Sequence, residues 1–436
     1  MEAIAGVPAL FKILILFACI MALYRARAPL YAALLAVSLG AGLWFGAGAW
    51  DTLRIMARSA VAQETLFLYA VVALILGYSN MLDKTGILNG IVESFSRLFG
   101  RSMVSGAALP ALIGLLPMPG GAIFSAPMVQ AACGPGGGQT PEQKAAVNYW
   151  FRHIWEYWWP LYPGIIVASS LFRVSAWKLA AMHLPLTAVA VAAGYFIILR
   201  PSFPADGQPA QAGNGLRNGN LSSALNRSSS IIVTIVVIFG AGAALERSGL
   251  TPTAAKYWPV ILGIALGIAW VSVRHRLGAA RAARLLAVRG MGSMALLAMG
   301  VMVFRDTLVA VNAFAGVQAD LEAYRVPVVA VIAVLPFVSG MALGLAVGFV
   351  GASFPLVISL LPDSVAGSDA RLAYLTLAYT FGYMGMMLSP VHLCLVLTRD
   401  FFKAEFSGIY KFLVPIAIII MLSGTGCFLV YRALFS

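Results

Sequence analysis

The strongest chemical signal in the sequence is the segment NYWFRHIWEYWWPLYPG at residues 148–164, which carries charged side chains inside an apolar stretch. Asn148, Arg152 and Glu156 are spaced four residues apart, so they share one face of a continuous helix. An ionisable side chain at mid-membrane costs at least about 2.5–3.5 kcal/mol and usually faces a polar cavity or a partner. We therefore expect this face to line a binding site.

Arg152 is the candidate ligand for an anionic substrate, and Asn148 belongs to the same candidate substrate site. A guanidinium group stays charged and binds a carboxylate or phosphate through two parallel hydrogen bonds, whereas a lysine acts only as a point charge. The alternative interpretation is an internal salt bridge between Arg152 and Glu156 near one membrane interface, which would only neutralise the two groups.

Two neighbours of Arg152 are candidates for ion coupling. Glu156, one helical turn away, could take up and release a proton or help to hold a sodium ion during a transport cycle. His153 is a second candidate for proton transfer, because its unperturbed pKa lies near neutral pH.

Prolines interrupt the spans at 145–171 and 371–398. Pro160 and Pro163 in the first, and Pro390 in the second, remove backbone donors and leave carbonyl groups free near the centres of these spans. Free carbonyl groups can coordinate a cation, so Pro160 and Pro390 mark a candidate ion site. The alternative is a simple proline kink, which is common in membrane helices.

Two apolar stretches, 103–132 and 327–361, are too long for one span and too short for two, and both are broken by glycine and proline. This pattern predicts helical hairpins that enter the membrane and return on the same side, with their irregular backbone buried in protein or lining a cavity. Glycines at the tips would let the backbone approach a ligand, although glycines also serve tight helix packing. The residues placed at the tips are Gly120, Gly121, Ser125, Gly348, Gly351 and Ser353.

Other polar and aromatic groups favour structural roles. Arg305 and Asp306 lie near the end of a span, as does Asp83, and a structural ion pair is the favoured interpretation. His392 is interpreted as a satisfied core residue, and the aromatic run 155–159 as packing or interfacial anchoring. The four cysteines are scattered without paired spacing, so no metal site is expected.

The composition describes the elements that must hold these residues. Hydrophobic residues make up 61% of the 436 residues and charged residues 10%, so most of the surface must face lipid. The net charge of +13 fits cytoplasmic loops rich in Lys and Arg, so nucleic-acid binding is not expected. The chain is predicted to be an all-α integral membrane protein with about ten transmembrane helices and two re-entrant hairpins. The spans are expected at 8–24, 29–48, 62–82, 145–171, 177–199, 230–247, 257–273, 290–312, 371–398 and 411–433.

The two halves match in order, which predicts an internal duplication of residues 1–200 and 230–436 joined by a polar linker at 201–229. The interrupted spans align at an offset of 230, so that Tyr149 meets Tyr379 and Pro160 meets Pro390. Five crossings in each half force the second repeat to be inverted. Lys and Arg are more frequent on the side of the RHRLGAARAARLLAVR loop, which predicts an inner-membrane protein with both termini outside the cytoplasm.

The segments LPMPGGAIFSAPMV, NYWFRHIWEYWWPLYPG and SGMALGLAVGFVGASFP resemble a family of uncharacterised bacterial and archaeal membrane proteins in the ion transporter superfamily. The resemblance covers nearly the whole chain. It implies two inverted repeats, each with one hairpin and one broken helix, and an anion carrier related to divalent anion to sodium symporters, citrate carriers and gluconate permeases. By analogy with these relatives it also implies a homodimer. The Ser-Asn-Thr signature of dicarboxylate symporters is absent, with Pro-Gly-Gly at 119–121 instead.

The leading hypothesis is a secondary active transporter, by symport or antiport, of a small organic anion of the carboxylate type. A sodium or proton gradient would drive alternating access between the two hairpin tips, with membrane lipid as the surroundings and no other cofactor. The alternative within transport is a translocase of lipid phosphate or another amphiphile. An intramembrane enzyme using His153 and Glu156 is disfavoured, because no HExxH metal motif or nucleophile partner accompanies them. A scaffold is disfavoured because paired broken hairpins have no evident structural benefit.

Overall fold

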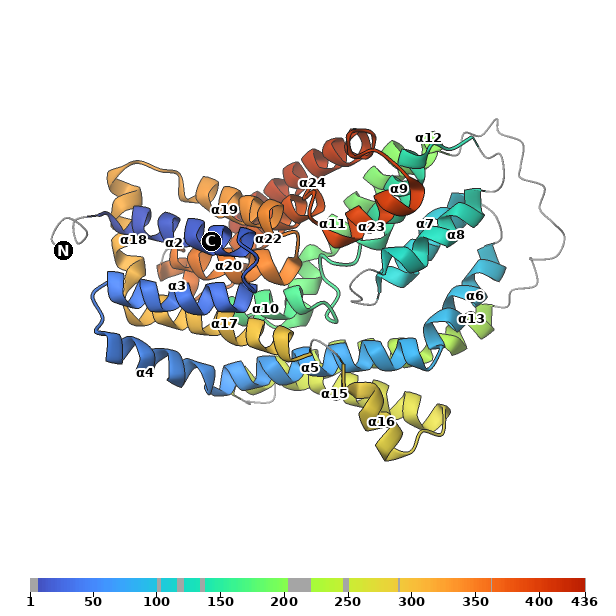
Figure 1. Cartoon of the computed structure of the whole chain (residues 1–436), viewed down its shortest axis with the longest axis horizontal. Helices are drawn as coiled ribbons and strands as arrows, with labels where there is room; N and C mark the ends of the chain where they lie inside the picture. Colours follow the sequence, from blue (N-terminus) through green and yellow to red (C-terminus); the bar gives the residue numbers. More distant parts are fainter. Residues whose placement is uncertain are drawn as a thin grey trace.

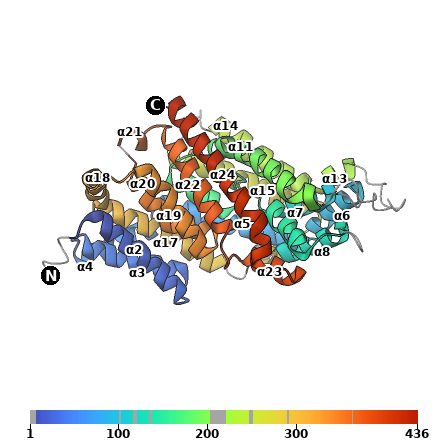
Figure 2. The same ribbon diagram turned by 90° about the horizontal axis from the view of Figure 1, so that it is seen from above.

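The computed structural model describes residues 7–99, 103–115, 121–133, 138–202, 221–245, 251–288, 291–361 and 363–435. Every regular element in these ranges is helical, which confirms the predicted all-α class (Figure 1). The molecule is elongated, with α2, α3, α4, α17 and α18 at one end and α6, α7, α8 and α13 at the other (Figures 1 and 2). The elements that form the candidate site lie between these two ends.

Among the described residues, the first half of the chain runs through ten helices, the last of which continues into a π-helical turn and a short helix. They are α2 (Ala9–Arg25), α3 (Leu30–Trp44), α4 (Ala49–Ala60), α5 (Gln63–Lys84), α6 (Ile87–Phe99), α7 (Met103–Gly114), α8 (Ala122–Cys133), α9 (Pro141–Arg152), α10 (Pro163–Leu171) and α11 (Ala176–Gly194), with η1 (Tyr195–Leu199) and α12 (Arg200–Ser202).

The second half shows the same order of helices, with two additional short helices, one before the series and one between its seventh and eighth members. Its helices are α13 (Leu221–Arg227), α14 (Ser229–Leu245), α15 (Pro252–Arg274), α16 (Ala279–Leu286), α17 (Met291–Ala310), α18 (Ala313–Ala323), α19 (Val328–Leu343), α20 (Ala346–Ser359), α21 (Asp363–Ala366), α22 (Arg371–Met387), α23 (Leu393–Phe402) and α24 (Phe406–Phe435).

Short helices that the sequence did not predict also occur in matching places. In the first half α4 and α6 flank α5, and in the second half α16 and α18 flank α17. Both α4 and α16 carry their charged residues among apolar ones at helical spacing, as helices at a membrane interface do. The matching order agrees with an internal duplication, whereas the inverted orientation of the second repeat stays a prediction.

The chain is a multi-pass membrane protein. Among the described residues, five helices are long and apolar enough to cross a membrane, and a sixth is added if the bent pair α13 and α14 counts as one span. Each of the ten predicted spans coincides with a helix or a broken pair of helices. However, α2 and α3 have only 17 and 15 residues, and two other predicted spans are broken. The count of ten crossings therefore stays a prediction.

The predicted linker at 201–229 is partly helical, which corrects the sequence-based boundary. Leu221–Arg227 forms α13, which packs against α6. Leu221, Ala224 and Leu225 follow helical spacing, and Ala224 is buried. Residues 203–220, the rest of the predicted linker, lie outside the described residues.

Both predicted hairpins form pairs of short, packed helices. α7 packs against α8 and α19 against α20, and each of the four helices has 12–16 residues. A helix that spans the membrane needs about 20 residues. These four helices are therefore shorter than full spans, as a re-entrant hairpin requires.

The hairpins contact the broken spans in the same way in both halves. A Cβ atom at Gly114 of α7 would lie 1.9 Å from the carbonyl oxygen of Arg152, and one at Gly340 of α19 would lie 2.1 Å from that of Gly382. Gly340 follows Gly114 by 226 residues, and Gly382 follows Arg152 by 230. The same close crossing of two backbones therefore occurs at aligned positions.

A hydrogen bond repeats at the next aligned positions although the donors differ in type. Nε1 of Trp159 donates to the carbonyl oxygen of Leu115 at 2.7 Å. Oγ of Ser389 donates to that of Met341, also at 2.7 Å. These pairs are related by the same offsets of 230 and 226 residues. The same contact is therefore made in both halves by different residue types, and the internal duplication stays a prediction.

Charged groups from three helices meet near the C-terminal end of α10, where Lys256 Nζ also donates to the carbonyl oxygen of Ser170 at 3.4 Å. Lys256 Nζ lies 2.5 Å from Glu64 Oε1, and Arg305 Nη1 lies 3.3 Å from Glu64 Oε2. Arg305 Nε also lies 3.8 Å from Asp306 Oδ1, and Ser59 donates to the Asp306 carboxylate at 2.6 Å. The predicted ion pair between Arg305 and Asp306 is confirmed, within a network that joins α5, α15 and α17.

Glu64→Gln is expected to destabilise the protein by about 2–3 kcal/mol, because it leaves two buried cations without their shared carboxylate. The cost falls below that of a fully buried pair because the Glu64 side chain is 21% exposed. Thermal unfolding in detergent measures the effect. Asp51→Asn is the control, since the exposed Asp51–Arg54 pair should contribute only about 0–1 kcal/mol. Equal melting temperatures of Glu64→Gln and wild type would contradict the prediction.

Candidate functional site

The first broken span ends its leading helix at Arg152. Residues 153–162 form irregular turns, and α10 begins at Pro163. Pro160 and Pro163 lack backbone donors, and a residue that precedes a proline avoids the α conformation, so the helix cannot continue through this segment. The expectation that Glu156 shares a continuous helical face with Asn148 and Arg152 is therefore wrong. Only Asn148 and Arg152 lie on α9.

Side-chain donors satisfy the backbone carbonyl groups that the break releases. Tyr383 Oη donates to the carbonyl oxygen of His153 at 2.6 Å, and Tyr379 Oη to that of Glu156 at 2.9 Å. His183 Nδ1 lies 2.8 Å from the carbonyl oxygen of Tyr157. Buried carbonyl groups need such partners in a membrane. These three carbonyl groups therefore each have a side-chain partner, and the break does not leave them unsatisfied.

The aromatic run of the break also has a defined role. Trp155 Nε1 donates to the carbonyl oxygen of Ala111 and Trp159 Nε1 to that of Leu115, each at 2.7 Å. Tyr162 Oη donates to the carbonyl oxygen of Gly114 at 2.5 Å. The last carbonyl groups of a helix have no partner within the helix. These three aromatic residues therefore cap the C-terminal end of α7 and fix the first hairpin to the break.

Tyr383→Phe is expected to destabilise the protein by about 0.5–1.5 kcal/mol, because the buried carbonyl of His153 loses the shorter of its two hydrogen bonds and keeps only the backbone N–H of Glu156 at 3.2 Å. Chemical denaturation in detergent measures the change. The control is Tyr374→Phe, whose ring packs edge-on against Phe428 at a distance from the break. A loss of stability no greater than that of the control would show that the hydroxyl group of Tyr383 contributes nothing.

The second broken span lies between α22, which ends at Met387, and α23, which begins at Leu393. The two breaks contact each other, since Tyr149 Oη donates to the carbonyl oxygen of Met387 at 3.0 Å. Pro390 is exposed and does not line the cavity described next, whereas His392, two residues later, does. The structure therefore does not bring Pro390 into the site.

A cavity of about 150 Å³ lies where the two breaks meet the turn of the second hairpin. Its walls come from α5, α17, both breaks and the turn between α19 and α20, so both halves contribute. The polar residues that line it are Arg152, His153, Glu156, Tyr162, His392 and Cys394. Its apolar residues include Leu76, Met294, Leu297, Leu345, Val347 and Leu393.

Arg152 is 2% exposed and occupies the centre of the polar group. Its Nη1 lies 3.3 Å from Nε2 of His153 and 3.4 Å from Sγ of Cys394. A Cβ atom at Gly121 would lie 2.3 Å from Arg152 Nη2, so only a glycine leaves room for the guanidinium group against the first hairpin. Gly121, predicted for the tip of the first hairpin, therefore lies against the guanidinium group of Arg152.

Asn148 connects the first hairpin to the second broken span. Its Nδ2 donates to the carbonyl oxygen of Ala122 at 3.1 Å and to Thr398 Oγ1 at 3.0 Å. Its Oδ1 is buried without a hydrogen-bond partner among the described residues. Asn148 does not line the cavity, so it acts one layer behind Arg152 and positions α8 and α23.

Glu156 and His153 lie together beside Arg152. Glu156 Oε1 is 3.8 Å from His153 Nε2, and both side chains are buried. His153 Nδ1 lies 2.6 Å from the carbonyl oxygen of Tyr149. A carbonyl can only accept, so Nδ1 carries the proton and Nε2 presents a lone pair towards Arg152. Both predicted coupling residues therefore face the cavity.

The remaining predicted hairpin residues do not reach it. Ser125 and Ser353 donate to the carbonyl oxygens of Ala122 and Phe349 within their own helices. Gly351 packs against α17, where a Cβ atom would lie 2.4 Å from Cγ2 of Val301. For Gly351 the alternative interpretation, helix packing, is correct.

The tip of the second hairpin lies earlier in the chain than expected. Gly344 ends α19 with φ of +62°, and α20 begins at Ala346, so Gly348 lies inside a helix. Gly344 lines the cavity. Glycine adopts its left-handed backbone conformation without strain, which other residues do not. Gly120, predicted for the first tip, lies outside the described residues.

Sequence reasoning missed Cys394 and assigned His392 to the core. The repeat alignment held a signal for both, because His392 and Cys394 stand 230 residues after Tyr162 and Gly164. All four of these residues line the cavity. Once one break is recognised as a site, the aligned positions of the other break become candidates.

Comparison with known proteins places these features in context. No curated protein matches the chain. Among solved structures, the chain is similar to the YdaH transporter of Alcanivorax borkumensis, with 14% sequence identity and a TM-score of 0.49 over 88% of this chain and 89% of that one. The family described as "Protein of unknown function (DUF401)" matches residues 10–211 and 261–431, and the chain belongs to this family.

Proposed function

We propose that this protein is a secondary active transporter of a small organic anion of the carboxylate type. One observation carries the proposal: the buried guanidinium of Arg152 stands at the end of a broken helix, against the first hairpin and beside a cavity that the second hairpin closes. An ionisable group inside a membrane protein usually faces a polar cavity or a partner, and Arg152 lines the cavity. An anionic substrate is the partner that fits a guanidinium fork.

The cavity favours a small substrate with an apolar part. A cavity of about 150 Å³ is large enough for a molecule of the size of benzene. Arg152 and Tyr162 lie in its polar part, whereas leucine, methionine and valine side chains form the rest. We therefore expect a monocarboxylate with a compact apolar body to bind better than a highly charged tricarboxylate.

Glu156 is the proposed coupling group, with His153 beside it. A buried carboxylate next to the guanidinium of Arg152 can bind a proton or a sodium ion, and either would compensate the carboxylate charge. Substrate binding at Arg152 would then depend on the occupancy of Glu156. The position of Glu156 fits coupling by a proton as well as coupling by a sodium ion.

Alternating access would come from movement between the two halves. Arg152, His153 and Glu156 belong to the first half, and Gly344, His392 and Cys394 to the second, so the cavity walls separate if the halves move apart. Broken helices and hairpins at the meeting point of repeats are the arrangement used by many secondary transporters. Inner-membrane location, external termini and a homodimer remain further predictions of this proposal.

Thermal unfolding of the purified protein tests the proposal. We expect one class of carboxylates to raise the melting temperature, and more strongly in sodium than in potassium if sodium is the coupling ion. A ligand at 100 times its Kd stabilises the folded state by about 2.7 kcal/mol, which is readily measured. The positive ligand is then tested for uptake into proteoliposomes under a sodium or a proton gradient.

Two outcomes would count against the proposal. Stabilisation by anionic lipid but by no soluble anion would favour the amphiphile translocase. Binding of a carboxylate without uptake under either gradient would favour a receptor or a scaffold. Both results would leave the fold described above unchanged.

A further inference from the structure

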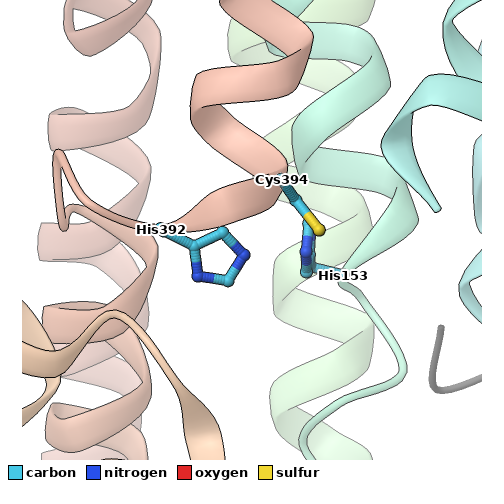
Figure 3. A group of neighbouring side chains, drawn as sticks. All are labelled: His153, His392 and Cys394. Atoms are coloured by element: carbon cyan, nitrogen blue, oxygen red, sulfur yellow. The ribbon is translucent and has the colours of Figure 1, made fainter. Parts of the chain in front are cut away.

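Three side chains that commonly bind transition metals lie together at the cavity. Ligand atoms of His153, His392 and Cys394 all lie within 4.8 Å of one another, and all three residues are buried. The rings of His153 and His392 meet edge to face with centroids 5.2 Å apart. Figure 3 shows the Cys394 sulfur beside the His153 ring, with the His392 ring next to them.

The lone pairs of two of these ligands already point to a common position. His153 Nδ1 donates to the carbonyl of Tyr149, so Nε2 is an acceptor. Arg152 Nη1 is within 3.3 Å of this nitrogen and 3.4 Å of Cys394 Sγ. A guanidinium nitrogen can only donate, so His153 Nε2 and Cys394 Sγ both accept from Arg152 Nη1. The position of Nη1 is therefore one that the lone pairs of both atoms face. A metal ion near this position would be coordinated by the same two lone pairs.

The support around His153 is that of a metal ligand. Metal-binding histidines usually donate their second ring nitrogen to a carbonyl or a carboxylate, which fixes the ring and its tautomer. The contact from His153 Nδ1 to Tyr149 provides this support. His392 differs, because its Nδ1 is buried without a hydrogen-bond partner among the described residues. Either ring nitrogen of a histidine can bind a metal, so His392 can adjust by ring rotation.

The donor set selects the kind of metal. Two imidazoles and one thiolate suit zinc and other borderline or soft ions, and they do not suit magnesium or calcium, which prefer oxygen. Zinc bonds of about 2.0–2.1 Å to nitrogen and about 2.3 Å to sulfur require the ligands to close by roughly 1 Å from the present contacts with Arg152. Glu156, 3.8 Å from His153 Nε2, supplies negative charge beside the site.

We propose that His153, His392 and Cys394 form a binding site for one zinc-like transition-metal ion, and that this ion competes with the Arg152 guanidinium. His153 belongs to the first broken span, whereas His392 and Cys394 belong to the second. A bound ion would therefore link the two halves of the chain. On the proposed transport function, which this consequence assumes, zinc would hold the halves together and inhibit uptake.

Metal binding by the purified full-length protein tests the site without any transport assay. The protein is stripped with a chelator, equilibrated with zinc, exchanged into metal-free buffer and analysed for bound zinc. We expect about one ion per chain. Cobalt serves as a second probe, because a cobalt–thiolate bond gives a charge-transfer absorption that reports directly on Cys394.

Substitutions identify the ligands. Cys394→Ser and His392→Gln should each weaken zinc binding at least about 10-fold, and Cys394→Ser should remove the cobalt–thiolate absorption. Cys133→Ser and His275→Gln are the controls, since they change a buried cysteine of α8 and an exposed histidine at the end of α15, neither of which lines the cavity. Zinc binding that is equally strong in Cys394→Ser and wild type, or absent from wild type, would overturn the proposal.

Arg152→Gln separates this proposal from the transport function. Because the guanidinium competes for the same lone pairs, its removal should strengthen zinc binding, whereas the transport proposal requires it to weaken anion binding. Unchanged or weaker zinc binding in a folded Arg152→Gln protein would contradict the competition. Zinc binding without any anion effect would retain the metal site and reject the carrier, and the reverse result would retain only the carrier.

Discussion

Replacing Arg152 with glutamine is expected to abolish the stabilisation that a soluble carboxylate gives to the purified protein. Truncating one partner of a buried, hydrogen-bonded charge pair costs about 2–5 kcal/mol. This corresponds to a loss of roughly 30-fold or more in affinity. Isothermal titration with the carboxylate that stabilises wild type measures the effect, and uptake into proteoliposomes should fall in parallel.

Two further variants make this result specific. Arg152→Lys keeps the charge but loses the planar fork, so it should bind the carboxylate more weakly than wild type and more strongly than Arg152→Gln. Arg399→Gln is the control, because Arg399 lies on α23 close to Cys394 in sequence but pairs with Asp400 at the surface. Undiminished carboxylate affinity in a folded Arg152→Gln protein would remove the main support for the anion site.

Alanine at Gly114 or Gly340 is expected to cause the largest loss of stability. The added methyl group would lie 1.9 Å from the Arg152 carbonyl oxygen or 2.1 Å from that of Gly382, and real Cβ contacts below 3.0 Å essentially never occur. The obstacle is backbone, so no side-chain rotation relieves it, and the hairpin must move away from the broken span. We expect a cost of at least about 3 kcal/mol, at the upper end of overpacking effects. Folded yield and thermal unfolding in detergent measure it.

Gly40→Ala and Gly240→Ala are the controls for this prediction. Both glycines lie inside helices, and an added methyl group at either would meet nothing within 4 Å. Alanine has a higher helix propensity than glycine, so stability should stay the same or rise slightly. If Gly114→Ala and Gly340→Ala melted like these controls, the hairpins would not be held against the broken spans as described.

These two glycines also show how a contact can recur in both halves while most residue types differ. The halves share few identities, but Gly114 and Gly340 occupy aligned positions with the same backbone contact. At the neighbouring positions a tryptophan and a serine make equivalent hydrogen bonds. Tryptophan and serine can both donate a hydrogen bond, so the two halves can share this contact without sharing a residue type. Sequence identity between the halves is therefore lower than the similarity of their contacts.

Features that depend on local physics could be located from the amino-acid sequence. The apolar segments, both broken spans and both hairpins lie where the chain predicted them, because the length of an apolar run and the position of a proline act on neighbouring backbone. The choice of Arg152, His153 and Glu156 rested on the same logic. A charged group in an apolar segment needs a partner wherever the segment lies.

Which residues line the cavity depends on packing between segments that are far apart in the sequence. His392 and Cys394 lie about 240 residues beyond His153, and nothing in their own neighbourhood marks them as partners of that residue. The hairpin turn at Gly344, the engaged carbonyl groups of the first break and the helical placement of Ser125 follow equally from long-range contacts. Local pattern places each break along the chain, but only the folded arrangement brings the two breaks together around one cavity, because the contacts that join them connect opposite halves of the sequence.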